Sequence, residues 1–329
     1  MALPASRRVD GARALAGSPE SALVAIGNFD GVHRGHQDVI LAAVELARAR
    51  GLVPLVLTFE PHPSEVLGRG RRALLTTLER KIELITRLDP TLRVVVEPFT
   101  LALAQESPEQ FAQELLAREL HAKVVIVGDN FRFGHRRAGD LATLRRLGEA
   151  LGFEARAEPL TSDAGGALSS SRVRAAVAAG DVEAAALVLG RPHSLSGRVV
   201  EGDRRGRTIG VPTANLDGIP EARPANGVYA SLVDRLDDEG GARSLALGVT
   251  NLGVRPTVGG GPSVETHLLD FDGDLYGARL RLHLVARLRE ERRFDGLEAL
   301  VAQIRRDVAE ARALLAARRP DPAAAGAWC

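Results

Sequence analysis

The sequence contains almost no cysteine: among its 329 residues, only the last one, Cys329, is of this type. A disulfide bond within the chain is therefore excluded, which favours a reducing compartment, and we expect a cytoplasmic protein. Long apolar runs are also missing, so we expect no helix that crosses a membrane. Residues 1–19 lack a continuous apolar segment and do not have the pattern of a signal peptide.

Aromatic residues and net charge are scarce as well. Aromatics make up 4% of the chain, so alanine, leucine and valine must fill most of the core. The formal net charge is only +1, which argues against a general nucleic-acid binder, although arginine clusters occur at 69–72 and 204–207. The length suits two domains, whereas the oligomeric state stays open.

The first part of the chain alternates short apolar runs with helical patterns. We predict strands at 22–26, 52–59, 92–96, 123–127 and 153–157, and helices that include 39–47, 78–88, 108–120 and 141–151. Nearly continuous apolar strands between helices indicate an α/β fold with a parallel sheet covered on both faces. Ligands of such sheets bind beyond the carboxyl ends of the strands.

The pattern changes near residue 190, where Gly190, Arg191 and Pro192 interrupt the last helix. We predict strands near 195–201, 227–236, 244–250, 264–271 and 279–287, followed by a helix at 296–316. This arrangement predicts a small antiparallel β-barrel with a closing helix. The expected domains are therefore 1–190 and 191–318, with a disordered tail at 319–329.

The segment after the first strand reads Gly-Asn-Phe-Asp-Gly-Val-His-Arg-Gly-His, from Gly27 to His36. His33 and His36 are three residues apart at a helix start, so both rings can face one side. The free N–H groups and the dipole of that helix favour phosphate, and two imidazoles beside them can stabilise a transferring phosphoryl group.

A histidine pair of this spacing also has simpler interpretations. It can consist of two surface histidines in a glycine-rich turn. A metal-binding pair is less favoured, because zinc normally has a third protein ligand. Neither the Gly-x-Gly-x-x-Gly pattern of dinucleotide folds nor a P-loop is present, which disfavours both of those phosphate-binding folds.

Two further segments offer polar groups to a nucleotide. Asn130 has a carboxamide for adenine or ribose, and Phe131 and Phe133 beside it can equally be core residues. Three serines, Ser169–Ser171, stand at another helix start, where they can bind a triphosphate or simply cap the helix. Arg174, one turn later, can pair with phosphate.

The second part of the chain has its own candidate site. Thr213 and Asn215 supply a hydroxyl and a carboxamide oxygen, which suit Mg²⁺ that bridges nucleotide phosphates. The glycines nearby permit close backbone approach to those phosphates. A β-turn with a proline and a capping threonine is the alternative.

Several motifs in order resemble the bifunctional riboflavin kinase/FMN adenylyltransferase (FAD synthetase) family of the prokaryotic two-domain type. They are the segment 27–36, Gly-Asp-Asn-Phe-Arg-Phe-Gly at 128–134, Leu-Ser-Ser-Ser-Arg-Val-Arg at 168–174, Gly-Val-Pro-Thr-Ala-Asn at 210–215, Asn-Gly-Val-Tyr-Ala at 226–230, Asn-Leu-Gly-Val-Arg-Pro-Thr at 251–257, Val-Glu-Thr-His-Leu at 264–268 and Leu-Arg-Glu-Glu-Arg-Arg-Phe at 288–294. The resemblance covers about residues 20–315.

The resemblance implies a Rossmann-like nucleotidyltransferase domain followed by a riboflavin kinase barrel. Riboflavin would be phosphorylated to FMN, and FMN adenylylated to FAD with release of pyrophosphate, with ATP as co-substrate and Mg²⁺ as cofactor. The implied partners are the small molecules riboflavin, FMN and ATP, without nucleic acid or membrane. Glu265 would be the general base that takes the proton of the ribityl 5′-hydroxyl.

The remaining roles follow from the same resemblance. Together with Glu265, the implied catalytic residues are His33 and His36. The adenylyltransferase would bind ATP and phosphate through Gly27, Phe29, Asp30, Asn130, Ser169, Ser170, Ser171 and Arg174. The kinase would bind ATP and flavin through Gly197, Gly206, Arg207, Gly210, Pro212 and Arg289, with Thr213 and Asn215 at the metal. For His267 a structural role is favoured.

The sequence departs from the family at the third motif. Ser171 stands where relatives usually have threonine, and Ala167 leaves no cation just before the serines, so that Arg172 or another residue would have to replace it. One alternative is therefore a riboflavin kinase with impaired adenylyl transfer. Another is a flavin-binding regulatory protein without turnover.

Overall fold

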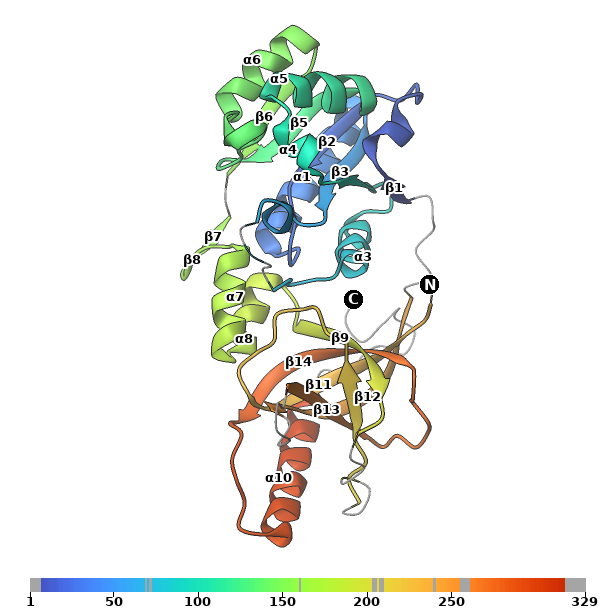
Figure 1. Ribbon diagram of the computed structural model, residues 1–329, viewed down its shortest axis with the longest axis vertical. Helices are drawn as coiled ribbons and strands as arrows, with labels where there is room; N and C mark the ends of the chain where they lie inside the picture. The colour runs from blue at the N-terminus through green and yellow to red at the C-terminus, as the bar shows by residue number, and fades with distance from the viewer. Residues whose placement is uncertain are drawn as a thin grey trace. The chain divides into compact units, whose positions relative to one another are not determined.

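The computed structural model describes residues 7–68, 70, 73–159, 161–202, 206, 210–238, 241–254 and 261–316 (Figure 1). These residues form two compact units. The first consists of the described residues before 73 together with Thr76–Ser169, and the second of Ala73–Leu75 and the described residues from Ser170 onward. Arg207 and the tail 319–329 lie outside the described residues.

The first unit contains the predicted parallel sheet, which has six strands because β1 joins the five predicted ones. Its strand order is β1-β4-β3-β2-β5-β6, with the bounds β1 (Arg8–Asp10), β2 (Ala22–Ile26), β3 (Val53–Glu60), β4 (Arg93–Pro98), β5 (Ala122–Gly128) and β6 (Glu154–Glu158). All five residues of β2 are buried, because helices cover both faces of this central strand.

Helices connect the strands. They are α1 (Arg34–Arg50), α2 (Pro63–Val66), α3 (Leu78–Leu88), α4 (Leu101–Gln105), α5 (Pro108–Gln110) and α6 (Leu141–Leu151), with 3₁₀ turns at Ala12–Leu15 and His135–Arg137, a π-helical run at Phe111–Glu119 and a small hairpin of β7 (Ser162–Asp163) and β8 (Gly166–Ala167). Ser107 caps α5 in a reciprocal pair of hydrogen bonds with Gln110. Gly51 ends α1 with a left-handed φ of 64°.

The strand order places the ligand end of this sheet. From β2 the chain adds β3 and β4 on one side, and β5 and β6 on the other. The loops after β2 and β5 therefore leave the sheet at its topological switch point, where ligands of open parallel sheets bind. The segments that follow are Gly27–His33 and Asp129–Asn130.

The second unit is built on a closed antiparallel barrel, which confirms the predicted fold class. Its order is β10-β13-β12-β11-β14-β9, with β9 (His193–Val200), β10 (Ala214–Asp217), β11 (Gly227–Leu236), β12 (Ala242–Val254), β13 (Pro262–Leu269) and β14 (Arg279–Arg289). Apolar side chains such as Leu195, Leu252 and Leu282 fill its interior. The strand β10 was not among the predicted elements.

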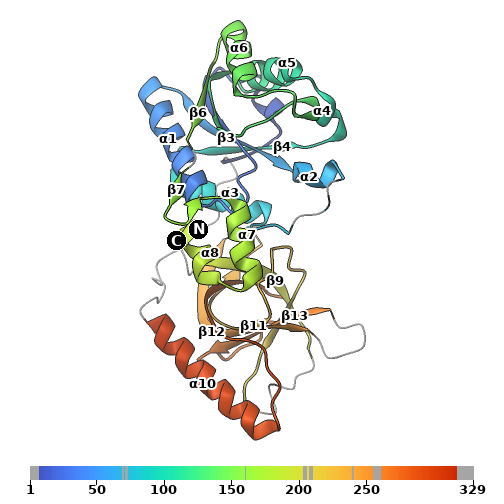
Figure 2. The ribbon, with the colours of Figure 1, turned by 90° about the vertical axis from the view of Figure 1, so that its left-hand side faces the viewer.

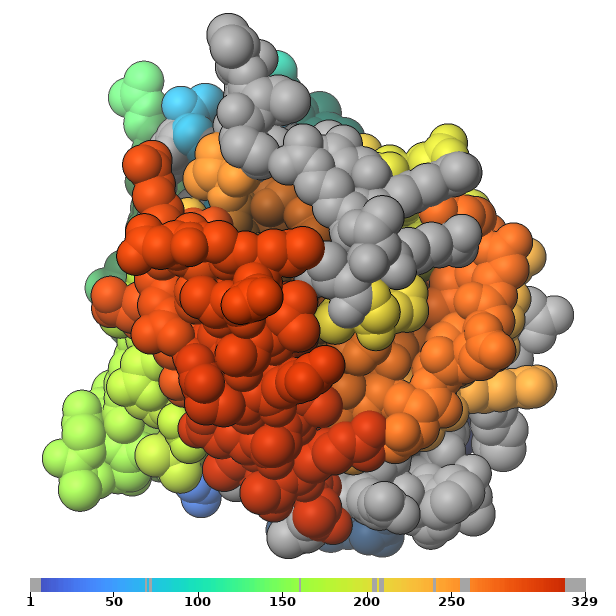
Figure 3. Space-filling view, turned by 90° about the horizontal axis from the view of Figure 1, so that it is seen from below, coloured from blue at the N-terminus to red at the C-terminus, as the bar shows by residue number. Residues whose placement is uncertain are grey.

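The helices α7, α8 and α10 lie in the described part of the barrel unit. The closing helix α10 (Leu297–Ala316) lies across the outside of the barrel (Figure 3). Its residues Ala311 and Leu315 pack on Val228, Val249 and Leu269. The helices α7 (Ser170–Ala179) and α8 (Val182–Leu189) pack together, and α8 contacts β9 and β14 (Figure 2). By contacts the chain divides between Ser169 and Ser170, whereas the sequence pattern changes near residue 190.

Among the helices that the structure describes, none combines the length and the apolar character that a membrane span needs.

Candidate active sites

The two predicted histidines meet at the start of α1. His33 is the N-cap residue, and its Nδ1 accepts a hydrogen bond of 3.3 Å from the backbone N–H of His36. The two rings stack with their centroids 3.6 Å apart and an angle of 22° between their planes. His33 is buried and His36 half-buried. The pair thus stands at the N-terminus of a 17-residue helix, where backbone dipoles favour an anion.

The loop before the pair is tightly turned. Phe29 and Val32 have positive φ angles of 47° and 39°, which residues other than glycine rarely adopt. The buried ring of Phe29 contacts the ring of His36 edge-on, with centroids 5.2 Å apart. Gly27 leaves room for this ring, because a Cβ there would lie 2.9 Å from it. Phe29 therefore supports His36 from inside.

Polar residues of two other elements hold the same loop. Asp30 is buried and its Oδ1 accepts a 3.3 Å hydrogen bond from the Thr76 N–H, while the Gly31 N–H donates to the Thr76 hydroxyl at 3.2 Å. Thr58, near the end of β3, donates its hydroxyl to the carbonyl of Asn28 at 3.2 Å. The loop is thus connected to the residues before α3 and to β3.

A buried lysine completes this network. Lys81 of α3 is only 5% exposed, and its Nζ donates to the Thr58 hydroxyl at 3.4 Å. Burial lowers the pKa of Lys81, and the negative charges of Asp30 and Glu60 oppose that shift. Burial likewise raises the pKa of Glu60, while Lys81 lowers it. Sequence reasoning missed Lys81, although its spacing from Leu78 and Ile85 places it on the apolar side of the helix.

The other predicted residues of the adenylyltransferase fall into two groups. Asn130 is exposed just after β5, and Ser169 is half-buried at the end of the first unit. The neighbouring ring of Phe133 is buried and contacts Phe111 and Phe131, which fits the alternative of core packing. Ser170, Ser171 and Arg174 lie on α7 in the second unit, where the Arg174 Nε donates to the Ala73 carbonyl at 3.2 Å.

In the barrel, one row of paired residues joins the predicted metal and base positions. Asn215 of β10 lies opposite Glu265 of β13, and Glu265 lies opposite Asn251 of β12. The adjacent Leu216 and Val264 point into the barrel core. Because side chains alternate along a strand, the row Asn215–Glu265–Asn251 faces outward. Glu265 is half-buried there.

A pocket of about 310 Å³ opens beside this row. Pro212, Thr213 and Asn215 line it, together with Gly202, Gly206, Phe271 and Tyr276. A side chain on Gly202 would collide with the carboxamide of Asn215, and one on Gly206 with the carbonyl of Val211. The two glycines therefore let the backbone close around Thr213 and Asn215. Phe271 and Tyr276 are aromatic lining residues that sequence reasoning missed.

The remaining predicted kinase residues have different surroundings. Gly197 packs against the carbonyl of Asp217, where a Cβ would come within 2.8 Å. Gly210 has a left-handed φ of 73° in the turn before Pro212. Arg289 binds Asp307 of α10 in a bidentate ion pair. The ring of His267 contacts the carbonyl of Pro212, which fits the structural role that the sequence favoured.

Comparisons with known proteins match each of the two parts of the chain to a family. A family model described as FAD synthetase matches residues 16–172, and one described as riboflavin kinase matches residues 189–315. A bifunctional riboflavin kinase/FMN adenylyltransferase of Escherichia coli K12 is 39% identical over 303 residues, which are 92% of this chain and 95% of that protein. The relative from Pseudomonas fluorescens is 40% identical over 293 residues, 88% of this chain and 92% of its own.

The chain belongs to the bifunctional riboflavin kinase/FMN adenylyltransferase family.

A solved structure supports the fold of this family member. A crystal structure from Streptococcus pneumoniae, described as a macrolide-efflux protein, matches with a TM-score of 0.81 and 27% identity. The match covers 93% of this chain and 99% of that one. The two chains therefore share their fold.

Proposed function

We propose that the two reactions of the family are divided between the two compact units. The first unit adenylylates FMN at the His33–His36 pair, and the barrel phosphorylates riboflavin at the row that contains Asn215 and Glu265. The observation that carries this division is that the two polar sites belong to separate units, each with its own apolar core.

In the adenylyl transfer, an oxygen of the FMN phosphate attacks the α-phosphorus of ATP. The new P–O bond gives FAD, and the bond to the leaving pyrophosphate breaks, so no covalent enzyme intermediate is needed. His33 and His36 hydrogen-bond the charged oxygens that develop, and the N-terminal amides of α1 add to this stabilisation. Asn130 and Ser169 of the same unit are proposed to position the nucleotide.

In the kinase reaction, Glu265 takes the proton of the ribityl 5′-hydroxyl as its oxygen attacks the γ-phosphorus of ATP. The γ-phosphoryl group moves to riboflavin and ADP leaves. Positioning and charge neutralisation supply most of the acceleration in such transfers. Thr213 and Asn215 stand in the pocket that would hold the triphosphate, and Phe271 and Tyr276 offer aromatic faces to its base.

The donor set at this pocket fits Mg²⁺. Thr213 and Asn215 provide neutral oxygen atoms, and Gly202 makes the space that the carboxamide occupies. Magnesium prefers oxygen ligands and usually keeps substrate phosphates and water in its shell. When bound, the ion would neutralise charge on the β- and γ-phosphates. In the described part of the chain, no group of three or more His, Cys, Asp or Glu is arranged as a metal site.

The test uses the purified full chain with riboflavin, ATP and Mg²⁺, and separates the flavins by chromatography. His33→Ala should lose FAD and still accumulate FMN. Glu265→Ala should lose FMN formation by about 10²- to 10⁴-fold, yet still convert supplied FMN to FAD with release of pyrophosphate. Each variant thus keeps one activity as evidence that the chain is folded.

Three outcomes would contradict the proposal. Loss of both activities in either folded variant contradicts the division between the units. If the wild-type chain forms FMN from riboflavin but makes no FAD when FMN is supplied, it is a kinase with impaired adenylyl transfer. Tight flavin binding without ATP consumption indicates a regulatory protein.

The single cysteine, Cys329, supports the cytosol as the compartment in which the chain works.

A further inference from the structure

We propose that Asp307 of α10 is a positioning residue for riboflavin phosphorylation. It holds Arg289, and through Arg289 it orders the segment Glu290–Phe294 beside the row that contains Glu265. This inference rests on the proposed kinase role of that row. Asp307 lies in none of the sequence motifs, and the resemblance implied a direct contact of Arg289 with flavin or phosphate.

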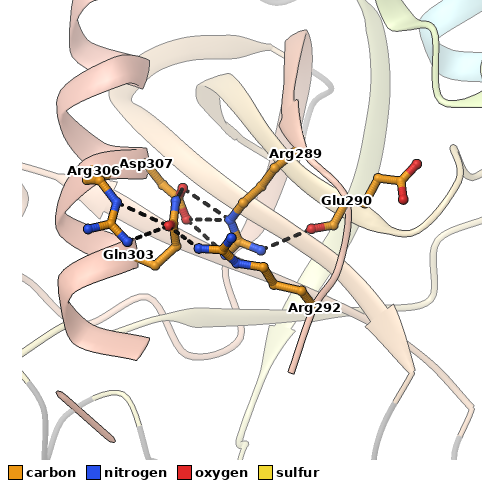
Figure 4. A network of polar contacts seen from close by, with 6 residues as sticks. All are labelled: Arg289, Glu290, Arg292, Gln303, Arg306 and Asp307. Carbon is orange, nitrogen blue, oxygen red and sulfur yellow. Dashed lines mark hydrogen bonds and ion pairs between the residues drawn. The ribbon is translucent and has the colours of Figure 1, made fainter. Parts of the chain in front are cut away.

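The pair Arg289–Asp307 is a forked ion pair, in which Asp307 is buried and Arg289 half-buried (Figure 4). The Nε of Arg289 donates to both carboxylate oxygens at 3.1 and 3.0 Å, and its Nη2 donates to Oδ2 at 2.9 Å. The side chain of Asp307 is only 3% exposed and that of Arg289 19%. Gln303, one turn earlier on α10, donates to the same carboxylate at 2.6 Å. Charge-assisted bonds of this geometry hold both side chains in one arrangement.

Arg289 passes this order on to the segment that follows β14. Its Nη1 donates to the carbonyl of Glu290 at 3.0 Å, and its guanidinium lies 5.5 Å from the ring centroid of Phe294. Arg292 lies over the same ring at 4.9 Å and also hydrogen-bonds Gln303. Both ends of Glu290–Phe294 are therefore tied to a single side chain, which Asp307 holds.

The middle of the segment reaches the barrel strands near Glu265. Glu291 accepts a hydrogen bond of 3.3 Å from the carboxamide of Asn226, and Gly253 leaves the space that its carboxylate occupies. Gly253 is two residues from Asn251, which pairs with Glu265. Since Asn251 also pairs with Val228, and Val228 with Arg289, one outward row runs from Glu265 to the ion pair.

The closure of the barrel decides how the ion pair reaches the base. In the closed order of six strands, β13 and β14 are three strands apart in either direction, so Glu265 and Arg289 stand on opposite sides of the barrel. The segment Glu290–Phe294 bridges this separation, because its Glu291 lies at Gly253 of β12, the strand that pairs with Glu265. All three guanidinium nitrogens of Arg289 already have acceptors within the protein. These contacts use three of the five N–H donors of Arg289, and we infer that it acts on riboflavin through the segment that it orders.

The structure offers a matched control on the same helix. Arg312 of α10 forms a second forked pair, with Asp270 at the end of β13, at 2.6 and 2.7 Å. This pair is exposed, with 43% of the Arg312 side chain and 72% of the Asp270 side chain accessible. Arg312→Gln removes an ion pair of the same kind between α10 and the barrel, and the two hydrogen bonds of that pair join Arg312 to Asp270 rather than to the segment Glu290–Phe294.

The experiment compares Asp307→Asn, Arg289→Gln, the double variant and Arg312→Gln in the full chain. We expect Asp307→Asn to lower kcat/KM for riboflavin phosphorylation by about 10- to 100-fold, mainly through the KM for riboflavin. Adenylylation of supplied FMN should stay within about twofold, and Arg312→Gln should resemble the wild type in both assays. Both single substitutions break the same Arg289–Asp307 ion pair. The kcat/KM of the double variant should therefore be no lower than that of Asp307→Asn alone.

Several results would overturn the inference. If Asp307→Asn lowers only the melting temperature and keeps the wild-type kcat/KM below it, the pair is a structural clamp. If Arg289→Gln costs more than Asp307→Asn and the two losses add, Arg289 contacts the ligand itself. Should Asp307→Asn fail to fold, Arg289→Lys, which keeps the charge but loses the fork, must show the same rise in KM. A wild-type chain that forms no FMN would instead refute the proposed kinase function.

Discussion

The Nδ1 atom of His267 lies 2.7 Å from the carbonyl oxygen of Pro212. The ring therefore carries its proton on Nδ1 and donates it to that carbonyl. His267 is two residues from Glu265 on β13, so both side chains point to the same outer face. Pro212 directly precedes Thr213, so a single strand presents the proposed base and also holds the loop of the proposed metal ligand.

This contact predicts the effect of His267→Phe on the kinase. The ring shape is kept and the donor is lost, which removes one hydrogen bond worth about 0.5–1.5 kcal/mol. We expect the KM for ATP in riboflavin phosphorylation to rise about 2- to 10-fold, with a smaller effect on kcat. Steady-state kinetics check this. His267→Asn restores an N–H near the same place and should recover part of the loss. An unchanged KM in His267→Phe would show that the loop holds its position without the ring.

The buried Lys81 predicts a defect confined to the first unit. Lys81→Met keeps the length of the side chain but removes the positive charge that Lys81 places near the buried Asp30 and the half-buried Glu60. Since Asp30 and Thr58 hold the loop before His33, we expect adenylylation of FMN to fall about tenfold or more while riboflavin phosphorylation is retained.

The chain has one other lysine, the exposed Lys123 on β5, and Lys123→Met is the matched control. It should leave both activities unchanged. The two rates are measured in the same preparation, with FMN supplied for the first and riboflavin for the second. Equal rates of FAD formation in both lysine variants would show that Lys81 does not support the loop.

A buried carboxyl group predicts how the barrel unit responds to pH. Glu221 is 5% exposed, and burial raises its pKa above the ordinary value of 4.5. Hydrogen bonds from Ser196 and the charge of Arg281 oppose the shift without cancelling it. Between pH 4.5 and the raised pKa, the folded chain therefore binds more protons at this site than the unfolded chain. The stability that protonated Glu221 contributes is complete below pH 4.5 and is lost as the pH rises through the folded pKa.

Glu221→Gln tests this, because the amide keeps an acceptor for the Ser196 N–H and does not titrate. We expect the free energy of unfolding of the variant to gain on that of the wild type as the pH rises from about 4 to 8. Urea unfolding at a series of pH values measures it. The exposed Glu310 on α10 provides the control substitution, Glu310→Gln. Parallel curves for Glu221→Gln and the wild type would exclude the effect.

The sequence predicts well those elements in which local pattern and burial agree. The bounds of α3 and α6 coincide with the predicted 78–88 and 141–151, because caps and apolar spacing both mark them. Four short strands were missed, namely β1, β10 and the two strands β7 and β8 of the small hairpin. In β1 only Val9 is apolar, so no run stands out, and β10 is four residues long between Pro212 and Gly218. Its motif residues also suggested a loop.

The sequence motifs predicted which residues form the two candidate sites, but not how these residues lie relative to one another. Spacing placed His33 and His36 on one face of a helix, and the structure stacks them. Pairing across strands, which puts Glu265 between Asn215 and Asn251, depends on a register that no local pattern specifies. Lys81 and Asp307 stand on the apolar sides of their helices, which was an available sign of burial, but the partners of such residues come from distant segments.

The strand order of the first unit also shows how its sheet avoids joining other sheets. Its two edges, β1 and β6, have unpaired backbone groups, which readily recruit a further strand. β1 is only three residues long, with charged residues at both ends, and β6 alternates charged side chains with alanine in Glu154–Glu158. The apolar strand β2 lies in the middle of the sheet. The most apolar strands thus lie away from the two edges at which aggregation of this sheet could begin.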